Sequence, residues 1–346
     1  MKITLQRLLS SALIVLMIVL ATIFLNCTSP TTSPAVTVYT YDSLAEGLGR
    51  QVADEFEKKT GIKTSLVTFG SCGEALNQVI LEGARTQADL LLGIDHSMLA
   101  RAKDSGILSE SEFNVSAIIP KDLWLEESHS IVPFDYGYLA FVYDSKRVAI
   151  PEASISLWDF SHDDRWKNRV VIQDPRTSSI GLSFLLWTHF IFDEKRRISF
   201  WKQFTNQLLT ITPGWSSAYG LFLNQEVDFV LSYTTSPAYH IEVEKNMSMR
   251  ALLFSEGHYR QVEGAALVKF SKHRDWAKKW IEILLSHSVQ SQLPLGQWMY
   301  PVRTDVSLPK SFEGLIQPKV IRPKDFTSND RREWIQKWVN VVSKLP

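Results

Sequence analysis

Apolar and polar residues alternate along the first part of the chain in a pattern that predicts short strands separated by amphipathic helices. Val36–Thr40 and Lys63–Phe69 carry the β-branched and aromatic residues typical of strands, and Ala88–Gly93 is a short apolar run typical of a buried strand. Between these strands, apolar residues recur at helical spacing in Ala45–Lys59 and Glu74–Gly83. This order predicts a parallel or mixed sheet covered by helices.

Polar residues follow each of these strands. Because ligands of such sheets gather at the carboxyl ends of strands, these positions are candidate binding residues. They are Tyr41-Asp42, Gly70-Ser71-Cys72 and Ile94-Asp95.

A second unit of strands and helices begins near Ala140, and the two units predict two α/β lobes between which the chain crosses more than once. The strands expected there are Leu139–Tyr143, Val170–Gln173, Val227–Ser232 and Glu263–Phe270; the helices are Ile180–Phe192, Ile198–Leu209, Trp276–Leu285 and Asn329–Lys344. We assign residues 36–132 and 262–310 to one lobe, residues 133–261 to the other, and residues 311–346 to a C-terminal helical segment.

The N-terminus has the order of an export signal. Lys2 and Arg7 precede an uncharged, mostly apolar run, Leu8–Leu25, and a Ser/Thr/Pro-rich stretch follows. Phe24-Leu25-Asn26-Cys27 resembles a lipobox, which predicts a lipoprotein signal over residues 1–27, acylation of Cys27 and a linker over residues 28–35. The run is also close to the length that spans a bilayer, so an uncleaved anchor is the alternative. Both interpretations place the rest of the chain in the periplasm or on the extracytoplasmic face, attached to the membrane.

Charge, cysteine count and missing motifs narrow the functional classes. Lys+Arg 37 balance Asp+Glu 37, which argues against a nucleic-acid partner. The chain has 2 cysteines, so Cys72 lacks an intramolecular partner if Cys27 carries a lipid. Phosphate-binding G-x-x-x-x-G-K-[ST], H-E-x-x-H, G-x-S-x-G and paired C-x-x-C motifs are absent, which lowers the expectation of an enzyme. We expect a monomeric, non-enzymatic protein without a metal or cofactor.

Several short segments combine Tyr and Trp with Ser and Thr. They are Tyr39–Ser43, Pro133–Tyr138, Asp174–Ser179, Gly214–Gly220, Ser232–Tyr239, Ser255–Tyr259 and Trp298–Pro301. In this order they resemble the thiamine-binding periplasmic proteins of ABC importers, from about Val36 to Val302. The resemblance implies the two-lobed type II periplasmic binding protein fold, with mixed sheets flanked by helices and a ligand cleft between the lobes. It also implies thiamine or its phosphates as ligand and a permease as partner.

The resemblance assigns roles to particular side chains. Tyr41, Tyr239 and Trp298 match aromatic positions that enclose the ligand rings, while Trp215, Tyr233 and Ser178 match positions around the hydroxyethyl or phosphate end. A cation over an aromatic face gains about 0.5–2 kcal/mol, which suits the cationic thiazolium. Ser178 and Ser179 precede the apolar helix from Ile180, where amides can receive a phosphate; simple N-capping is the alternative role for both. Tyr219 is a further candidate because it lies in the segment Gly214–Gly220.

The chain departs from the family in the turn after the second strand. There the relatives carry an acidic residue that meets the aminopyrimidine, whereas this chain has Ser71. Glu74, at the following helix start, is the candidate replacement, and a neutral hydrogen bond from Ser71 is the alternative. The tryptophan that follows the first strand in relatives has no counterpart, since Leu48 is the nearest position.

Other interpretations stay open. A thiaminase-like enzyme of the same fold would use Cys72 as nucleophile, with Glu74 as base. A ferric-ion carrier of related fold would need adjacent tyrosines, but Tyr233 is followed by Thr234. Asp135, Asp174 and Arg176 are interpreted as turn residues, with a carboxylate close to the bound cation as the alternative.

Overall fold

A computed structural model describes residues 35–110, 113–150 and 154–343. Its strands are β1 (Ala35–Tyr41), β2 (Lys63–Phe69), β3 (Leu90–Asp95), β4 (Ile131–Asp144), β5 (Val170–Gln173), β6 (Leu208–Thr212), β7 (Phe229–Tyr233), β8 (Met249–Ala251), β9 (His258–Leu267), β10 (Tyr300–Pro301) and β11 (Val320–Ile321). The predicted export signal, Cys27 and nearly all of the linker lie outside these residues. No helix among the described residues is both long and apolar enough to cross a bilayer.

The helices include a counterpart of each predicted helix and others that were not predicted, among them His96–Asp104 and Trp215–Leu223. The helices are α2 (Asp42–Leu44), α3 (Arg50–Thr60), α4 (Cys72–Glu82), α5 (His96–Asp104), α6 (Leu157–His162), α7 (Ser179–Ile191), α8 (Glu194–Phe204), α9 (Trp215–Leu223), α10 (Ser236–Glu242), α11 (Arg274–Leu284), α12 (His287–Gln290), α13 (Leu293–Gly296) and α14 (Ser328–Val342). A π-helical segment, Ala45–Gly49, joins α2 to α3.

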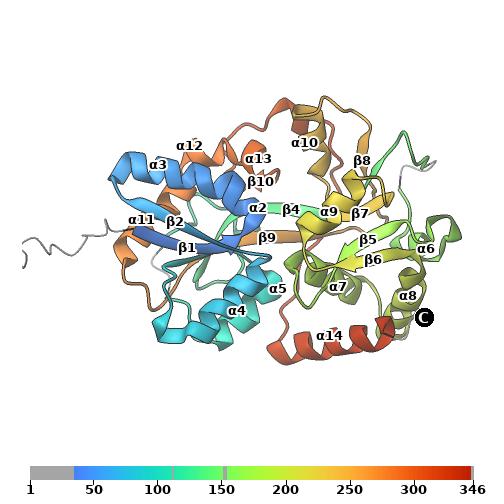
Figure 1. Cartoon of the computed structure of the whole chain (residues 1–346), viewed down its shortest axis with the longest axis horizontal. Coiled ribbons are helices and arrows are strands. Elements are labelled where there is room, and N and C mark those ends of the chain that lie inside the picture. The colour runs from blue at the N-terminus through green and yellow to red at the C-terminus, as the bar shows by residue number, and fades with distance from the viewer. Residues whose placement is uncertain (1–34, 111–112, 151–153, 344–346) are drawn as a thin grey trace, which may run out of the picture. The chain divides into compact units, whose positions relative to one another are not determined.

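The strands form one mixed sheet with the order β2-β1-β3-β9-β4-β7-β5-β6. β1 pairs in parallel with β3, and β5 pairs in parallel with β6 and β7. The long strands β4 and β9 pair antiparallel with each other through the middle of the sheet, and helices lie on both of its faces (Figure 1). The mixed α/β architecture is therefore confirmed.

The buried apolar side chains form two large clusters. We call the cluster around Val38, Leu91 and Trp280 the first core, and the aromatic-rich cluster around Phe141 and Phe184 the second core. Strands β4 and β9 contribute side chains to both, so the sheet connects the two cores without a break. The exact lobe boundaries stay a prediction.

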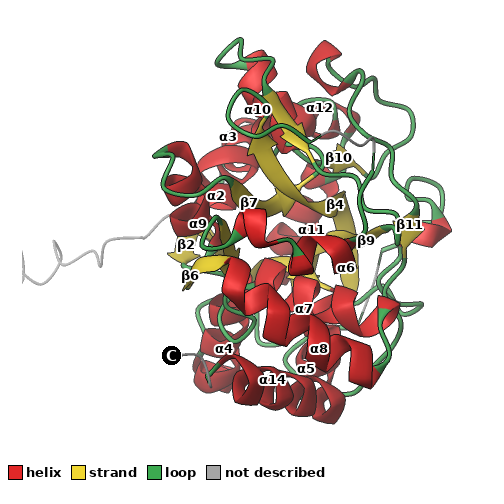
Figure 2. Ribbon diagram, turned by 90° about the vertical axis from the view of Figure 1, so that its right-hand side faces the viewer, coloured by secondary structure: helices red, strands yellow, loops and turns green. Residues whose placement is uncertain are grey.

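The C-terminal helix α14 packs beside α8 and approaches α5 (Figures 1 and 2). Trp338 is buried in the second core, edge-on to Trp201 of α8 with ring centroids 5.9 Å apart. Near the start of the helix, Phe326 contacts the ring of His96, the first residue of α5. The last segment therefore touches elements of both cores, although only its part from Ser328 onward is the predicted helix.

Two local predictions are wrong. The helix expected over Ile198–Leu209 ends at Phe204, because Leu208 begins strand β6 and pairs with Val170. Asp135 lies inside β4 opposite Glu263 of β9, so it is not a turn residue. Asp174 does lie beside a turn, where its carboxylate pairs with Arg176 at 2.5 Å.

Candidate functional site

A cavity of about 560 Å³ opens where elements of the first core meet elements of the second. Its volume is in the range of small-molecule sites, roughly 300–1,000 Å³. The amino ends of α2, α4, α7 and α9 reach it, as do β7, β9 and the chain around Trp298. The polar residues after β1 and β2 therefore meet in this cavity, whereas Ile94 and Asp95 after β3 do not line it; Asp95 instead caps α5 and is bonded to Ser97 and Gln261.

Aromatic side chains form two walls of this cavity. Trp298 stands edge-on to Tyr239, with ring centroids 5.2 Å apart and planes at 87°. Trp215 stacks on Tyr219 at 4.6 Å, and its indole N–H donates a hydrogen bond to Ser232 Oγ at 2.9 Å. Fixed rings of this kind present their electron-rich faces without a further loss of side-chain freedom, which suits a flat or cationic ligand.

The backbone of Trp298 is unusual, because its φ of 59° lies in the left-handed region. Bulky residues rarely adopt this conformation, and such strain is found mainly where the surrounding structure imposes it. Here the conformation directs the indole into the wall of the cavity beside Tyr239.

The floor of the cavity carries a buried carboxyl group that the sequence analysis did not identify. Tyr41 Oη donates to both oxygens of Glu263, at 3.0 and 2.9 Å, and Gln297 Nε2 donates to Tyr41 Oη at 2.9 Å. Gly93, with φ 100°, allows this arrangement, because a Cβ at that position would lie 2.7 Å from Tyr41 Cε1.

Burial sets the ionisation of this floor. It raises the pKa of Glu263 to about 8, with Asp95 adding to the rise while the Tyr41 hydrogen bond opposes it. Burial and the facing Glu263 also raise the pKa of Asp135 well above its usual range. The carboxyl group of Glu263 is therefore largely protonated at neutral pH, and a cation bound beside it would favour the ionised form.

Two helix starts complete the cavity. Ser71 Oγ accepts a hydrogen bond from Glu74 N at 3.2 Å, and Ser178 Oγ accepts one from Gly181 N at 3.4 Å. Both serines are thus N-caps, which is the structural role left open for Ser178. The capping bonds leave their hydroxyl hydrogens free to donate into the cavity.

The two sides of the cavity touch near its opening. Ser216 Oγ of α9 lies 3.3 Å from a carboxylate oxygen of Asp42 in α2. Gly214 is close enough to the chain of the first core that an added Cβ would lie 3.1 Å from the carbonyl oxygen of Gly70.

Cys72 lies in the cavity wall but lacks the properties of a nucleophile. Its side chain is buried and its thiol donates to the carbonyl of Leu92 at 3.5 Å. Burial, reinforced by Glu263 and Asp95, raises the pKa of the thiol well above its ordinary value. Since the thiolate is the reactive form, this environment argues against the thiaminase-like mechanism.

The structure brings together all but one of the predicted site residues. Those that line the cavity are Tyr41, Ser71, Ser178, Ser179, Trp215, Tyr219, Tyr233, Tyr239 and Trp298. Glu74 does not line it; its carboxylate accepts from Gly70 N at 3.0 Å, and the residue lines a neighbouring, smaller cavity. Leu48 is buried in the first core.

Glu263 was missed because the apolar run after it indicated only a buried strand, and nothing in the local pattern showed that its carboxyl group faces a cavity. The feature of the sequence that could have identified it is a carboxylate placed directly before the uncharged run Gly264–Val268. Among the described residues, no three His, Cys, Asp or Glu side chains are grouped so that they could hold a metal ion.

Comparison with known proteins gives consistent matches. The family model of the bacterial extracellular solute-binding proteins matches residues 36–293. The chain is 40% identical over 328 residues to the thiamine-binding periplasmic protein of Escherichia coli strain K12, covering 93% of this chain and 98% of that protein. It superposes on the solved structure of a periplasmic thiamin binding protein with a TM-score of 0.83 and 39% identity, covering 91% and 98% of the two chains. A ferric binding protein from Campylobacter jejuni shares the fold at 21% identity and a TM-score of 0.73, covering 89% of this chain and 98% of that one.

Proposed function

This chain belongs to the family of bacterial extracellular solute-binding proteins, and on that premise we propose that it binds thiamine or its phosphate esters for an ABC importer. The observation that carries the proposal is the aromatic cavity with a buried carboxyl group at its floor. The names of the relatives at 34–40% identity agree with this ligand.

The aromatic walls suit the two rings of thiamine. Thiamine has a permanently cationic thiazolium and a flat aminopyrimidine. A cation near the faces of Trp298 and Tyr239 gains about 0.5–2 kcal/mol, and a stacked ring pair adds about 0.5–1.5 kcal/mol. We assign ring recognition to these two side chains together with Tyr41.

Glu263 can take the role of the acidic residue that the relatives carry after the second strand and that this chain lacks. Its carboxyl group lies on the cavity floor beside Tyr41, whereas Glu74 is outside the cavity. An ionised Glu263 would attract the cation and accept hydrogen bonds from an amino group. We therefore assign to Glu263 the acidic role that the sequence suggested for Glu74, with Ser71 as an additional neutral partner.

The amino end of α7 is the proposed place for the hydroxyethyl or phosphate end of the ligand. Ser178 and Ser179 belong to this helix end, and Trp215 and Tyr233 line the same cavity. Helix-start amides and their dipole favour negative charge.

Delivery to a permease fits a hinge-closing cycle. Strands β4 and β9 connect the two cores, while contacts such as Asp42 with Ser216 join them across the opening. Solute-binding proteins of two lobes close around ligand by rotation at such connections. We propose that the closed form docks on the permease and that acylated Cys27 holds the protein at the membrane.

Isothermal titration of the mature protein with thiamine tests this function. We expect 1:1 binding, and Trp298→Ala should weaken it by at least tenfold, because the variant loses a ring of the binding wall. Trp276→Ala is the matched control: this indole lies on α11, is 38% exposed and does not line the cavity. Absence of heat with the folded wild type, or equal affinities in the two variants, would refute the assignment.

A further inference from the structure

A second, smaller cavity of about 90 Å³ shares Ser178 and Ser179 with the aromatic cavity. One water needs roughly 10–15 Å³ by this kind of measure, so the cavity has room for several waters or one small anion. Its wall comes from four separate parts of the chain: α4, α5, the amino end of α7 with the turn before it, and α14.

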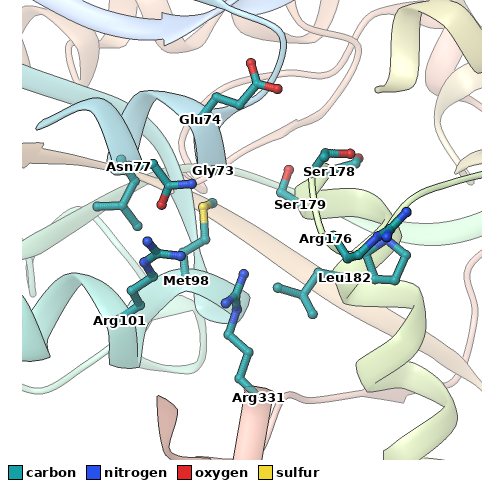
Figure 3. A pocket seen from close by; sticks show the side chains of 13 residues that line it. Gly73, Glu74, Asn77, Met98, Arg101, Arg176, Ser178, Ser179, Leu182 and Arg331 are labelled. Carbon is teal, nitrogen blue, oxygen red and sulfur yellow. The ribbon is translucent and has the colours of Figure 1, made fainter. Parts of the chain in front are cut away.

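Two arginines line this cavity without a carboxylate partner. Figure 3 shows Arg101 of α5 and Arg331 of α14 extending into the same space. Neither forms an ion pair with any acidic side chain among the described residues. The Nε–H group of Arg331 is buried and has no hydrogen-bond acceptor in the part of the chain that the structure describes.

The two guanidinium groups also act on each other. Burial lowers the pKa of Arg331, and the positive charge of Arg101 lowers it further. Asp95 opposes this fall in the pKa of Arg331, but its carboxylate is already bonded to Ser97, Gln261 and Ser183, and burial raises its own pKa to about 6. Two like charges that converge on an open space are unfavourable unless an anion enters it.

The other charged residues of this cavity are oriented differently. Arg176 forms a bidentate pair with Asp174 through Nε and Nη2, and most of its side chain is exposed. The carboxylate of Glu74 accepts from Gly70 N and points away from both Arg101 and Arg331 (Figure 3). The charge of Arg176 is therefore balanced by Asp174, and Glu74 does not neutralise the arginine pair.

The amino end of α7 adds to the positive potential. This helix has 13 residues, and its first amide groups have no acceptor inside the helix. Ser178 Oγ caps only the amide of Gly181. Two guanidinium groups and a helix start thus surround one small cavity, which is the donor set that a phosphate group prefers.

We propose that this cavity binds a phosphate group, held by Arg101 and Arg331 opposite the amino end of α7. The group would join α14 to α5 and α7, and so would tie the C-terminal segment to both cores. It has two possible sources: free orthophosphate, or the terminal phosphate of an ester whose rings occupy the aromatic cavity, since both cavities share Ser178 and Ser179. The second source rests on the proposed function; the first does not.

Thermal unfolding of the mature protein with inorganic phosphate tests the site directly, with chloride used to hold the ionic strength constant. If free phosphate is the ligand, it raises the melting temperature of the wild type but not of Arg331→Gln or Arg101→Gln. Arg332→Gln is the matched control, because Arg332 is the exposed neighbour on α14 and bonds Asn329 instead. This arm contains no thiamine, so its result is independent of the proposed function.

Titration with thiamine and with thiamine diphosphate distinguishes the two sources. If the phosphate of an ester occupies the cavity, Arg101→Gln and Arg331→Gln weaken diphosphate binding about tenfold or more relative to thiamine, and Arg332→Gln leaves the ratio unchanged. If free phosphate is the ligand, the ratio stays constant and only the thermal response is lost. The proposal is overturned if both variants behave as Arg332→Gln does in both measurements.

Discussion

Single backbone positions decide where the recognition side chains of the aromatic cavity lie. Gly93 interrupts the pairing of β3 with β9, and its φ of 100° leaves the space that the Tyr41 ring fills. Glycine is the residue that adopts this conformation without strain. The position of Tyr41, and with it the Tyr41–Glu263 hydrogen bond, depends on a residue that does not itself contact the ligand in our proposal.

Gly93→Ala is therefore expected to weaken thiamine binding by about tenfold or more, because the new Cβ would lie 2.7 Å from Tyr41 Cε1. Gly61→Ala is the control: Gly61 also has a positive φ, 72°, but an added Cβ there meets nothing within 4 Å. Both variants should lose some stability through backbone strain, roughly 1 kcal/mol or more. Titration calorimetry separates them, and equal affinities would contradict this role of Gly93.

The raised pKa of Glu263 predicts that ligand binding depends on pH. Its pKa of about 8 in the unliganded protein should fall when a cation binds, so binding releases a proton and affinity should rise with pH up to about 8. Glu263→Gln should remove this rise between pH 6 and pH 8. Exposed Glu74, changed to Gln, should leave it intact. Titrations in buffers of different ionisation enthalpy measure the proton release directly, and a flat wild-type profile would contradict the assignment.

The raised pKa of Glu263 also affects the stability of the protein when no ligand is bound. The folded state keeps the proton of Glu263 up to about pH 8, whereas the unfolded chain releases it near the ordinary carboxyl pKa of about 4.5. The unfolded state therefore binds fewer protons in this window, and this group makes the folded protein less stable as the pH rises through it. Thermal unfolding of the wild type and Glu263→Gln across the window should show a smaller loss in the variant.

At the scale of elements, the long strands β4 and β9 and the last helix α14 join the two apolar cores. Strands β4 and β9 place Asp135 opposite Glu263 and continue into both cores. Helix α14 contributes Trp338 to the second core while its beginning approaches α5. The segment after residue 310 is thus part of the folded unit.

Trp338→Ala should lower the free energy of unfolding by about 3 kcal/mol, since removal of a buried aromatic ring typically costs 3–5 kcal/mol. The side chain is 4% exposed and packs on Trp201. Lys337→Ala, on the same helix, should change stability little, because its ion pairs with Glu194 and Glu333 are exposed to solvent. Urea unfolding measures both. Equal stability of the two variants would mean that α14 is not anchored through Trp338.

At the scale of the whole molecule, the proposed transport cycle needs a protein held at the outer face of the membrane. The apolar run Leu8–Leu25 and the lipobox-like end at Cys27 support attachment by a lipid. Since the chain has 2 cysteines, each can be tested with the other as its control.

Cys27→Ser should abolish incorporation of labelled fatty acid into the full chain expressed in bacteria, and Cys72→Ser should not, because Cys72 is buried in the fold. Phase partition in a non-ionic detergent then reports whether the protein still associates with membrane. A Cys27→Ser protein that stays in the membrane fraction without ever having carried lipid would favour the uncleaved anchor.

The sequence by itself determined most of the strands and the longer helices, and its resemblance to a known family identified the aromatic side chains that line the cavity. The elements follow from short-range patterns, and β2 lies at Lys63–Phe69 as predicted. The polar residues after β1 and β2 line the cavity, in keeping with ligand binding at the carboxyl ends of strands. Where the pattern was ambiguous, as at Leu208, strand pairing with β5 overrode the helical periodicity.

Only the tertiary structure decided which distant residues act together. Tyr41 and Glu263 are 222 positions apart, and Arg101 and Arg331 come from different parts of the chain. Local periodicity shows that such a residue is on a strand or helix, but it contains no information about what faces it across the fold. The left-handed backbone of Trp298 and the raised pKa of Glu263 have the same origin, because both result from the packing and burial imposed by neighbours far away in the sequence.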